Sequence, residues 1–461
     1  AKQAERSGES IPSGFGVPEE EEEEAPEEKL TIIETLRLLG SASRGYWGVN
    51  LVNFGDGIAY FGVLNLLVLY LQHDAGMGTH GAHIAVSTFT GIVTVGMFLG
   101  GGFISDWLGV RRALTLALAL VLGGRVVLVA APAAGTATSV AAASWTALVI
   151  MGIGEAVIQP ALYAGVKEYS DRRTATMGYA LISAIMNLGI VAESLLSPVI
   201  RGWTRELKGI TDNPAGGISG VYWFIIGVTV LMLVGHLLVF TRRVERTQRV
   251  ADAEPAPVAM KGFRAKLKSM PLLDPRFLFF IFILLPVRTL FAHQWLTIPD
   301  YVMRAFPSEV GERFEWISAL NPGIIVIGVP LIAAWTRRVN IVTMMIVGTL
   351  ISAAATALLV PEPDVRVLVL YVVIFSLGEA AWSSRFLEYV AELAPAGRVG
   401  AYMGIATLPW VLAKSTTGWY SGYVLDAFVP KSGPQDGATM WLMYGAIALV
   451  SPVGLWLARG W

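Results

Sequence analysis

Charged side chains occur inside stretches of this sequence that are otherwise apolar enough to cross a membrane. A charge near the bilayer centre costs about 2.5–3.5 kcal/mol on insertion scales, so a retained one pairs with another group, lines a wet cavity or moves a proton. Eight residues have this character: Asp56, Arg125, Glu155, Glu193, Arg288, His293, Glu379 and Arg385. A buried ion pair or a side chain that reaches the interface explains Arg125, Glu193 and Arg385 equally well.

Helical periodicity places several of these charges on polar faces, because residues three, four or seven positions apart share one side of a helix. The faces combine Asn53, Asp56 and Tyr60; Glu155 and Gln159; Arg288, Phe291 and Trp295, with Gln294 at the edge; and Glu379, Trp382, Ser383 and Phe386. Such a mixture of carboxylates, amides, an arginine and aromatic rings favours a cavity for a polar, partly apolar solute. Asp56, Glu379 and Glu155 are the candidate proton-coupling residues, since a cavity carboxylate can bind and release protons.

The composition indicates an integral membrane protein. Of the 461 residues, 54% are hydrophobic and 15% are charged, against about 25% charged in soluble domains. The formal net charge of -1 excludes a nucleic-acid binder that acts through a global basic field. With no Cys and 5 His, we expect no metal site and no cofactor. The sequence contains no hydrolase serine motif, HExxH or phosphate loop, so we expect no enzyme.

Twelve stretches are long enough to span a bilayer, which takes about 20 mostly apolar residues. They cover residues 46–73, 84–106, 112–131, 142–166, 174–200, 219–241, 276–302, 311–335, 340–360, 366–391, 398–427 and 436–459. The predicted organisation is a disordered acidic cytoplasmic tail (1–30), a six-helix bundle (31–241), a basic linker (242–275) and a second six-helix bundle (276–461). A short interfacial helix is expected to open the first bundle.

Lys and Arg are concentrated in one set of loops. This set includes Arg111, Arg112, Arg338 and the basic linker, whereas the loops at 73–83 and 132–141 contain neither residue type. Because positive loops stay in the cytoplasm, both termini are expected there, in a plasma or inner membrane. The acidic tail is either simply solvated or a docking site for a protein partner.

Two short sequences support a fold-level resemblance. The loop GGFISDWLGVRR contains Gly102, Asp106, Gly109, Arg111 and Arg112, and a weaker echo, WTRR, occupies the equivalent place in the second half. Together with the six-plus-six layout, they resemble the major facilitator superfamily. That resemblance implies an all-α fold of two six-helix bundles with a midplane substrate site. The loop motif is then a cytoplasmic gate.

A closer resemblance is to the proton-dependent oligopeptide transporter family. GEAAWSSRFLEYVAELAPAGRVGAYMG, from Gly378 to Gly404, is similar to that family's tenth and eleventh helices, and MNLGIVAESLLSPVI to its fifth. The resemblance assigns Glu379 to proton and substrate binding and Asn187 to substrate contact. The segment NFGDGIAYFG resembles a degenerate form of the family's first-helix motif, E-x-x-E-R-F-x-Y-Y-G.

The chain departs from that family at the positions that would hold a peptide carboxylate. Asn53 replaces the first glutamate of the first-helix motif, Gly57 replaces its arginine, and Gln159 replaces the fourth-helix lysine. These changes argue against an ordinary peptide substrate and for a divergent relative with another small organic solute.

The functional expectation is proton-coupled symport of a small organic solute, peptide-like or other, by alternating access. The expected substrate-binding residues are Asn53, Tyr60, Gln159, Asn187, Arg288, Gln294, Trp382 and Ser383. Protonation of a carboxylate would release it from a cation such as Arg288. Three alternatives remain open: a proton-coupled exporter of drugs or lipids, an uncoupled facilitator, and a partner-binding assembly protein that has lost transport.

Overall fold

The computed structural model describes residues 42–97, 102–169, 175–210, 213, 215–248, 274–336, 338–393, 405–406 and 408–459. The predicted acidic tail, the interfacial helix and most of the basic linker lie outside these residues. The described chain is nearly all helical. Nine of its helices are long and apolar enough to cross a membrane.

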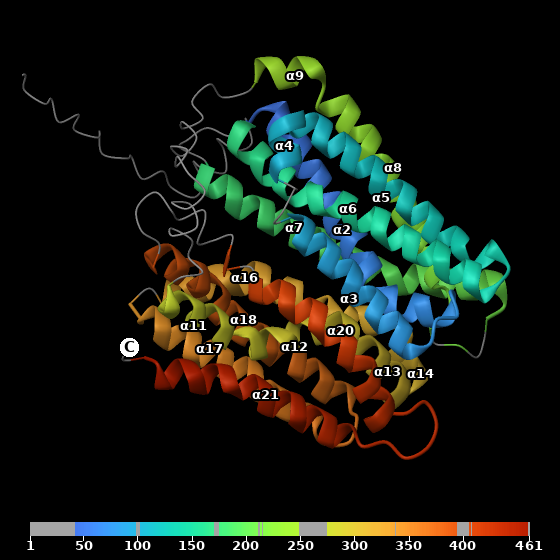
Figure 1. Cartoon of the computed structure of the whole chain (residues 1–461), viewed down its shortest axis with the longest axis vertical. Coiled ribbons are helices and arrows are strands. Elements are labelled where there is room, and N and C mark those ends of the chain that lie inside the picture. Colours follow the sequence, from blue (N-terminus) through green and yellow to red (C-terminus); the bar gives the residue numbers. More distant parts are fainter. Residues whose placement is uncertain are drawn as a thin grey trace, which may run out of the picture. The chain divides into compact units, whose positions relative to one another are not determined.

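The first half of the chain forms one group of packed helices (Figure 1). Its long helices are α2 (Arg44–His73), α3 (Thr79–Gly96), α5 (Val110–Ala130), α6 (Ala137–Tyr169), α7 (Ala175–Lys208) and α8 (Ile218–Val239), with short α4 (Gly102–Leu108), η2 (Ala131–Ala134) and α9 (Arg242–Thr247). Helix α2 packs against α7 and α8, and α5 packs against α6. The end of the helices at which α2 begins is called the Arg44 face, and the opposite end the Asp74 face.

The second half forms the other group, coloured yellow to red in Figure 1. It contains α11 (Pro275–Ile283), α12 (Leu285–Leu296), α13 (Ile298–Ala305), α14 (Ser308–Gly311), α15 (Phe314–Ser318), α16 (Leu320–Trp335), α17 (Ile341–Ala355), η5 (Thr356–Leu359), α18 (Val365–Leu393), α20 (Leu408–Phe428) and α21 (Gly437–Leu457). Helix α12 packs against α20 and α21, and α17 packs against α18. Contacts between the halves join α3 to α20, and α7 to α15 and α16.

The predicted span 276–302 is wrong as a single helix. The structure divides it into α11, α12 and α13. Pro286 and Pro299 lie in the first turns of α12 and α13, where a missing N–H breaks no helical bond. The predicted bend at Pro286 is confirmed, whereas the second break before Pro299 was not expected. The span 311–335 is likewise divided, between α15 and α16.

Helices α2 and α7 cross with their backbones in contact at two glycines. A Cβ on Gly57 would overlap the Met186 carbonyl, and one on Gly189 would overlap the Phe54 carbonyl. Small residues permit such approach between membrane helices. Asp56, next to Gly57 in sequence, accepts its hydrogen bond from Gln159 on a third helix, α6.

Candidate functional site

A cavity of about 230 Å³ lies in the wall formed by the second half. Its lining residues come from α12, α18, α20 and the short helical segment before α20: Arg288, Phe291, Glu379, Trp382, Ser383, Phe386, Ala406 and Trp410. The polar faces predicted for residues 276–302 and 366–391 therefore meet around one space. Glu379, Arg288, Trp382 and Ser383, all singled out from sequence, share this cavity.

Aromatic rings surround the Arg288 guanidinium. Its Cζ lies 4.4 Å from the Phe386 ring centroid, 5.4 Å from that of Trp382 and 5.8 Å from that of Trp410. The side chain is buried, and its Nε has no hydrogen-bond partner among the residues that the structure describes. Ring faces stabilise a guanidinium but leave its N–H groups free to donate in their own plane. Arg288 is thus positioned as a donor to a group that enters the cavity.

Glu379 is held by polar side chains of its own half. Asn321, at the start of α16, donates from Nδ2 to Glu379 Oε2 at 2.8 Å and to Ser376 Oγ at 2.9 Å. The expected ion pair between Arg288 and a carboxylate is not found within 4.0 Å among the described residues, which corrects that part of the prediction. The cavity therefore contains a cation and a carboxylate that are not paired.

Lys414, on α20, is a second cation near this wall. Its Nζ lies 4.8 Å from the Trp410 ring centroid and 5.6 Å from that of Trp295. No carboxylate of the described chain lies within 4.0 Å of it. The indole nitrogens of Trp295 and Trp382 are also buried without a hydrogen-bond acceptor.

The first half has its own buried polar cluster. Arg125 donates to Glu155 Oε1 at 2.7 Å and to Thr229 Oγ1 at 2.5 Å. Gln159, one turn after Glu155 on α6, donates to Asp56 Oδ2 at 3.2 Å. Asp56 Oδ1 is buried and has no partner among the described residues. The cluster thus holds two buried carboxyl groups, of which Glu155 is the one paired with Arg125.

The other predicted substrate residues make contacts elsewhere. Asn53 donates to the Ile182 carbonyl, Asn187 to the Ser183 carbonyl and Gln294 to the Tyr371 hydroxyl. Tyr60 packs against Phe61 and Phe89. None of these four residues lines the cavity described above.

The predicted gate motif is partly described. Gly109 has a φ of 77°, a conformation that favours glycine, and is the N-cap residue of α5. Arg111 Nε donates to the Phe240 carbonyl at the end of α8, at 2.7 Å, and Arg112 is exposed. Gly102 begins α4, while the side chain of Asp106 lies outside the description. The motif thus ties α5 to α8 within the first half.

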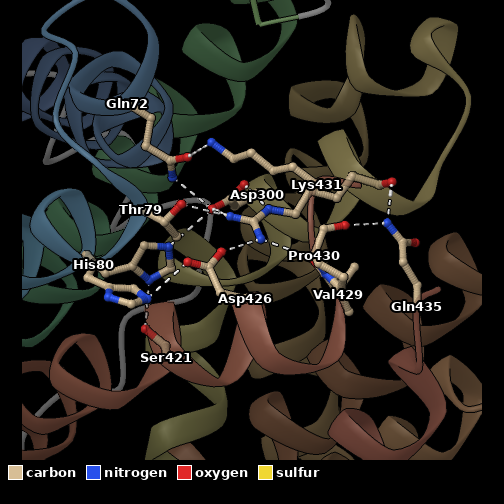
Figure 2. Close-up of polar contacts among 12 residues, drawn as sticks. Gln72, Thr79, His80, Asp300, Ser421, Asp426, Val429, Pro430, Lys431 and Gln435 are labelled. Carbon is tan, nitrogen blue, oxygen red and sulfur yellow. Dashed lines mark hydrogen bonds and ion pairs between the residues drawn. The ribbon is translucent and has the colours of Figure 1, made fainter. Parts of the chain in front are cut away.

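A polar network joins the two halves near the Asp74 face (Figure 2). This network, the first latch, comprises Gln72, Thr79, His80 and His83 from the first half and Asp300, Arg304, Ser421, Asp426 and Lys431 from the second. Gln72 donates to Asp300 at 2.7 Å, and His83 lies 2.7 Å from Ser421 Oγ and 3.4 Å from Asp300. The Asp74 face is therefore closed by direct contacts between the halves.

Asp300 is the acceptor at the centre of the first latch. It lies in α13, after the membrane-crossing segment Pro275–Leu296. Burial opposes its ionisation, but the His83 hydrogen bond and the Arg304 charge together hold the pKa of Asp300 well below its usual range. The carboxylate thus stays ionised at physiological pH.

A second latch joins α7 to the segment before α16. Arg201 Nη1 lies 2.6 Å from Glu315 Oε1, and both side chains are buried at 1% and 0% exposure. Arg205 pairs with Glu312 at 2.7 Å, and Trp316 Nε1 donates to the Leu195 carbonyl. Removing either charge of the Arg201–Glu315 pair would leave the other buried and unpaired.

Sequence reasoning missed both latches and Lys414. Lys414 lies inside the predicted span 398–427, so the rule that identified the other intramembrane charges applies to it equally. The latch residues lie at the ends of spans, where a charge is unremarkable. Only the pairing of distant helices reveals their roles as contacts between halves.

Membrane-crossing helices in two groups, joined at one face and carrying a cavity that contains a cation and a carboxylate, are typical of integral membrane transporters. The chain belongs to the Major Facilitator Superfamily, which matches residues 49–413. It is a transporter and not an enzyme.

Two curated relatives are similar in sequence. Peptide transporter family 1 of Drosophila melanogaster is 25% identical over 233 residues, which is 48% of this chain and 30% of the fly protein. The chain thus spans less than a third of that relative. YhjO of Bacillus subtilis (strain 168), an uncharacterized MFS-type transporter, is 20% identical over 363 residues, covering 78% of this chain and 82% of that protein.

Solved transporters share the fold. A POT family transporter in complex with 5-aminolevulinic acid has a TM-score of 0.66 at 16% identity, covering 90% of this chain and 96% of the other. Peptide transporter POT in complex with sulfate gives 0.66 at 17%, with 92% and 98% covered. The nucleoside transporter NupG gives 0.68 at 15%, with 90% and 99% covered. The predicted major facilitator fold is confirmed.

Proposed function

We propose that this transporter is a proton-coupled symporter that moves a small organic solute across a plasma or inner membrane by alternating access. The observation that carries the proposal is a cavity whose lining contains both Glu379 and Arg288, with no ion pair between them. An unpaired carboxylate can exchange a proton with an open cavity, and the cation beside it responds to the change in charge.

Both halves contribute to the proposed coupling. Asp56 and Glu155 lie in the buried polar cluster of the first half, and Glu379 faces the cavity in the second. With both termini cytoplasmic, as the distribution of Lys and Arg favours, the closed Asp74 face is the extracytoplasmic one. The two latches then have to break before a solute can enter from outside.

The proposal is tested in liposomes that contain the purified protein. An inward proton gradient is expected to drive accumulation of a solute, and collapse of the gradient to abolish it. Expulsion of solute driven by the same gradient would favour the exporter. Uptake that does not depend on the gradient would favour the uncoupled facilitator. A stable partner that requires residues 1–30, together with no transport of any solute, would favour the assembly protein.

A further inference from the structure

The wall around the cavity carries more positive charge than its described residues neutralise. Arg288 lines the cavity, and Lys414 lies 4.8 Å from the centroid of Trp410, another lining residue. Glu379 is the one carboxylate among the described lining residues, and Asn321 already donates to it. A buried cation without a counter-ion is costly in a membrane. A bound anion would remove that cost.

The buried nitrogen atoms around the cavity are hydrogen-bond donors without partners among the described residues. Arg288 Nε, Trp295 Nε1 and Trp382 Nε1 are buried N–H donors for which no described residue is an acceptor, and Lys414 adds an ammonium donor. Buried donors are expected to find an acceptor. The guanidinium of Arg288 lies in the cavity lining, and a carboxylate oxygen is the acceptor that suits a guanidinium best.

The remaining surface of the cavity is aromatic and apolar. Phe291, Phe386, Trp382 and Trp410 contribute rings, and Ala406 a methyl group. Rings of this kind bind planar or apolar groups and orient them. An inorganic anion would leave this surface without a partner.

We propose that the solute is an organic monoanion, in which a carboxylate binds Arg288 under the field of Lys414 and an aromatic or apolar body packs among the rings. This inference rests on the proposed transport function and names its substrate class. A cationic amine or drug is disfavoured, since Arg288 and Lys414 already occupy the faces of the rings that would attract it.

The test uses ligand sets that differ only in charge. Phenyl-, indolyl- and cyclohexyl-propanoates are titrated against the full chain in lipid nanodiscs by calorimetry and by thermal shift. Each is compared with the amide and the amine of the same skeleton, and with sulfate. At least one propanoate is expected to bind at least about tenfold more tightly than its amide or amine, as expected for a charge-assisted hydrogen bond. Sulfate is expected to bind more weakly than that propanoate.

Matched variants locate the binding site. Arg288→Gln and Lys414→Gln are each expected to weaken propanoate binding. The control Arg313→Gln removes an exposed arginine whose Cζ lies 5.4 Å from the Trp316 ring centroid, outside the cavity, and is expected to leave binding unchanged. Melting of the ligand-free variants checks that each is folded, and a loss of binding in folded Lys414→Gln supports the proposal even if Arg288→Gln does not fold.

Several results would overturn the inference. The first is an amine, an amide or sulfate that binds as tightly as the propanoates. The second is a lack of binding by every propanoate up to its solubility limit. The third is unchanged propanoate binding in both folded variants. Binding is measured without a gradient, so it does not depend on proton coupling. Proton-driven transport of another solute class would contradict the substrate class alone, whereas propanoate binding without any transport would contradict the proposed function alone.

Discussion

Arg304 donates two hydrogen bonds to Asp300, from Nε to Oδ1 at 2.9 Å and from Nη2 to Oδ2 at 3.1 Å. The same guanidinium donates to Asp426 on α20 at 2.7 Å and to Thr79 on α3 at 3.1 Å. One side chain thus orders contacts on three helices from both halves. The first latch is therefore a connected network, and the loss of its central carboxylate affects every member.

Asp300→Asn is expected to open the Asp74 face. The change leaves the buried Arg304 side chain with Asp426 alone as its carboxylate partner among the described residues, and breaking a buried pair costs up to about 3–5 kcal/mol. The chain has no Cys, so Thr417→Cys on α20, outside the first latch, provides a single reporter that is buried in the closed state. Labelling by an impermeant maleimide is expected to quicken by about tenfold or more.

The matched control is Glu362→Gln, which neutralises an exposed carboxylate at the same face. Its labelling rate is expected to equal that of the parent. Equal rates in the parent and in Asp300→Asn would show that the first latch does not hold this face closed.

Gly418→Leu is expected to prevent closure between α3 and α20. A Cβ at Gly418 would overlap Ser87 and the His83 carbonyl, and overpacking costs about 1–3 kcal/mol. Transport should fall and labelling of the Thr417→Cys reporter should rise. Gly227→Leu is the control, because a Cβ there has nothing within 4 Å. Equal effects of the two substitutions would refute the proposed role of this contact.

Glu379→Gln is expected to separate transport from proton coupling. The amide oxygen still accepts from Asn321 but cannot exchange a proton near neutral pH. Accumulation driven by a proton gradient should disappear, while counterflow of labelled solute should continue. If Glu379→Gln still accumulates solute at the parent level when a proton gradient is applied, Glu379 takes no part in proton coupling.

The Arg125–Glu155 pair is expected to be coupled energetically. Arg125→Leu and Glu155→Leu should each lower the free energy of unfolding by about 3–5 kcal/mol, because the partner is left buried. The double variant should cost less than the two single changes together. Thermal or denaturant unfolding of all four proteins measures the coupling, and strict additivity would argue against it.

Stability is expected to depend on pH through Asp74, at the end of α2. Burial, opposed by Lys208, raises the pKa of Asp74 to about 6. An acid whose pKa is raised by folding destabilises the fold once it ionises, so its cost grows as pH rises from about 4 to 6. Asp74→Asn should therefore raise the melting temperature at pH 7.5 but not at pH 4, and an equal shift at both values would contradict this.

The sequence predicted most of the fold because the bilayer restricts what can cross it. Hydropathy located α2, α5 and α21 to within a few residues, and Pro286 indicated a bend. The break at Pro299 was missed, since a proline near the end of a span looks the same whether the helix bends or restarts. Hydropathy also cannot show that Gly57 and Gly189 bring two helices into backbone contact.

Periodicity predicted the local geometry of the site but not its partners. Glu379, Trp382 and Ser383 share one face of α18 because helical spacing alone dictates it. That Glu379 accepts from Asn321, or that His83 reaches Asp300, depends on contacts between distant parts of the chain. The roles of the predicted site residues remain predictions.

The most direct test of proton coupling measures solute uptake and internal pH together in liposomes that contain the protein and a trapped pH dye. A solute gradient alone is expected to acidify the interior as the solute enters, and Glu379→Gln should abolish the acidification. Solute entry through the parent protein with no change in internal pH would contradict the account.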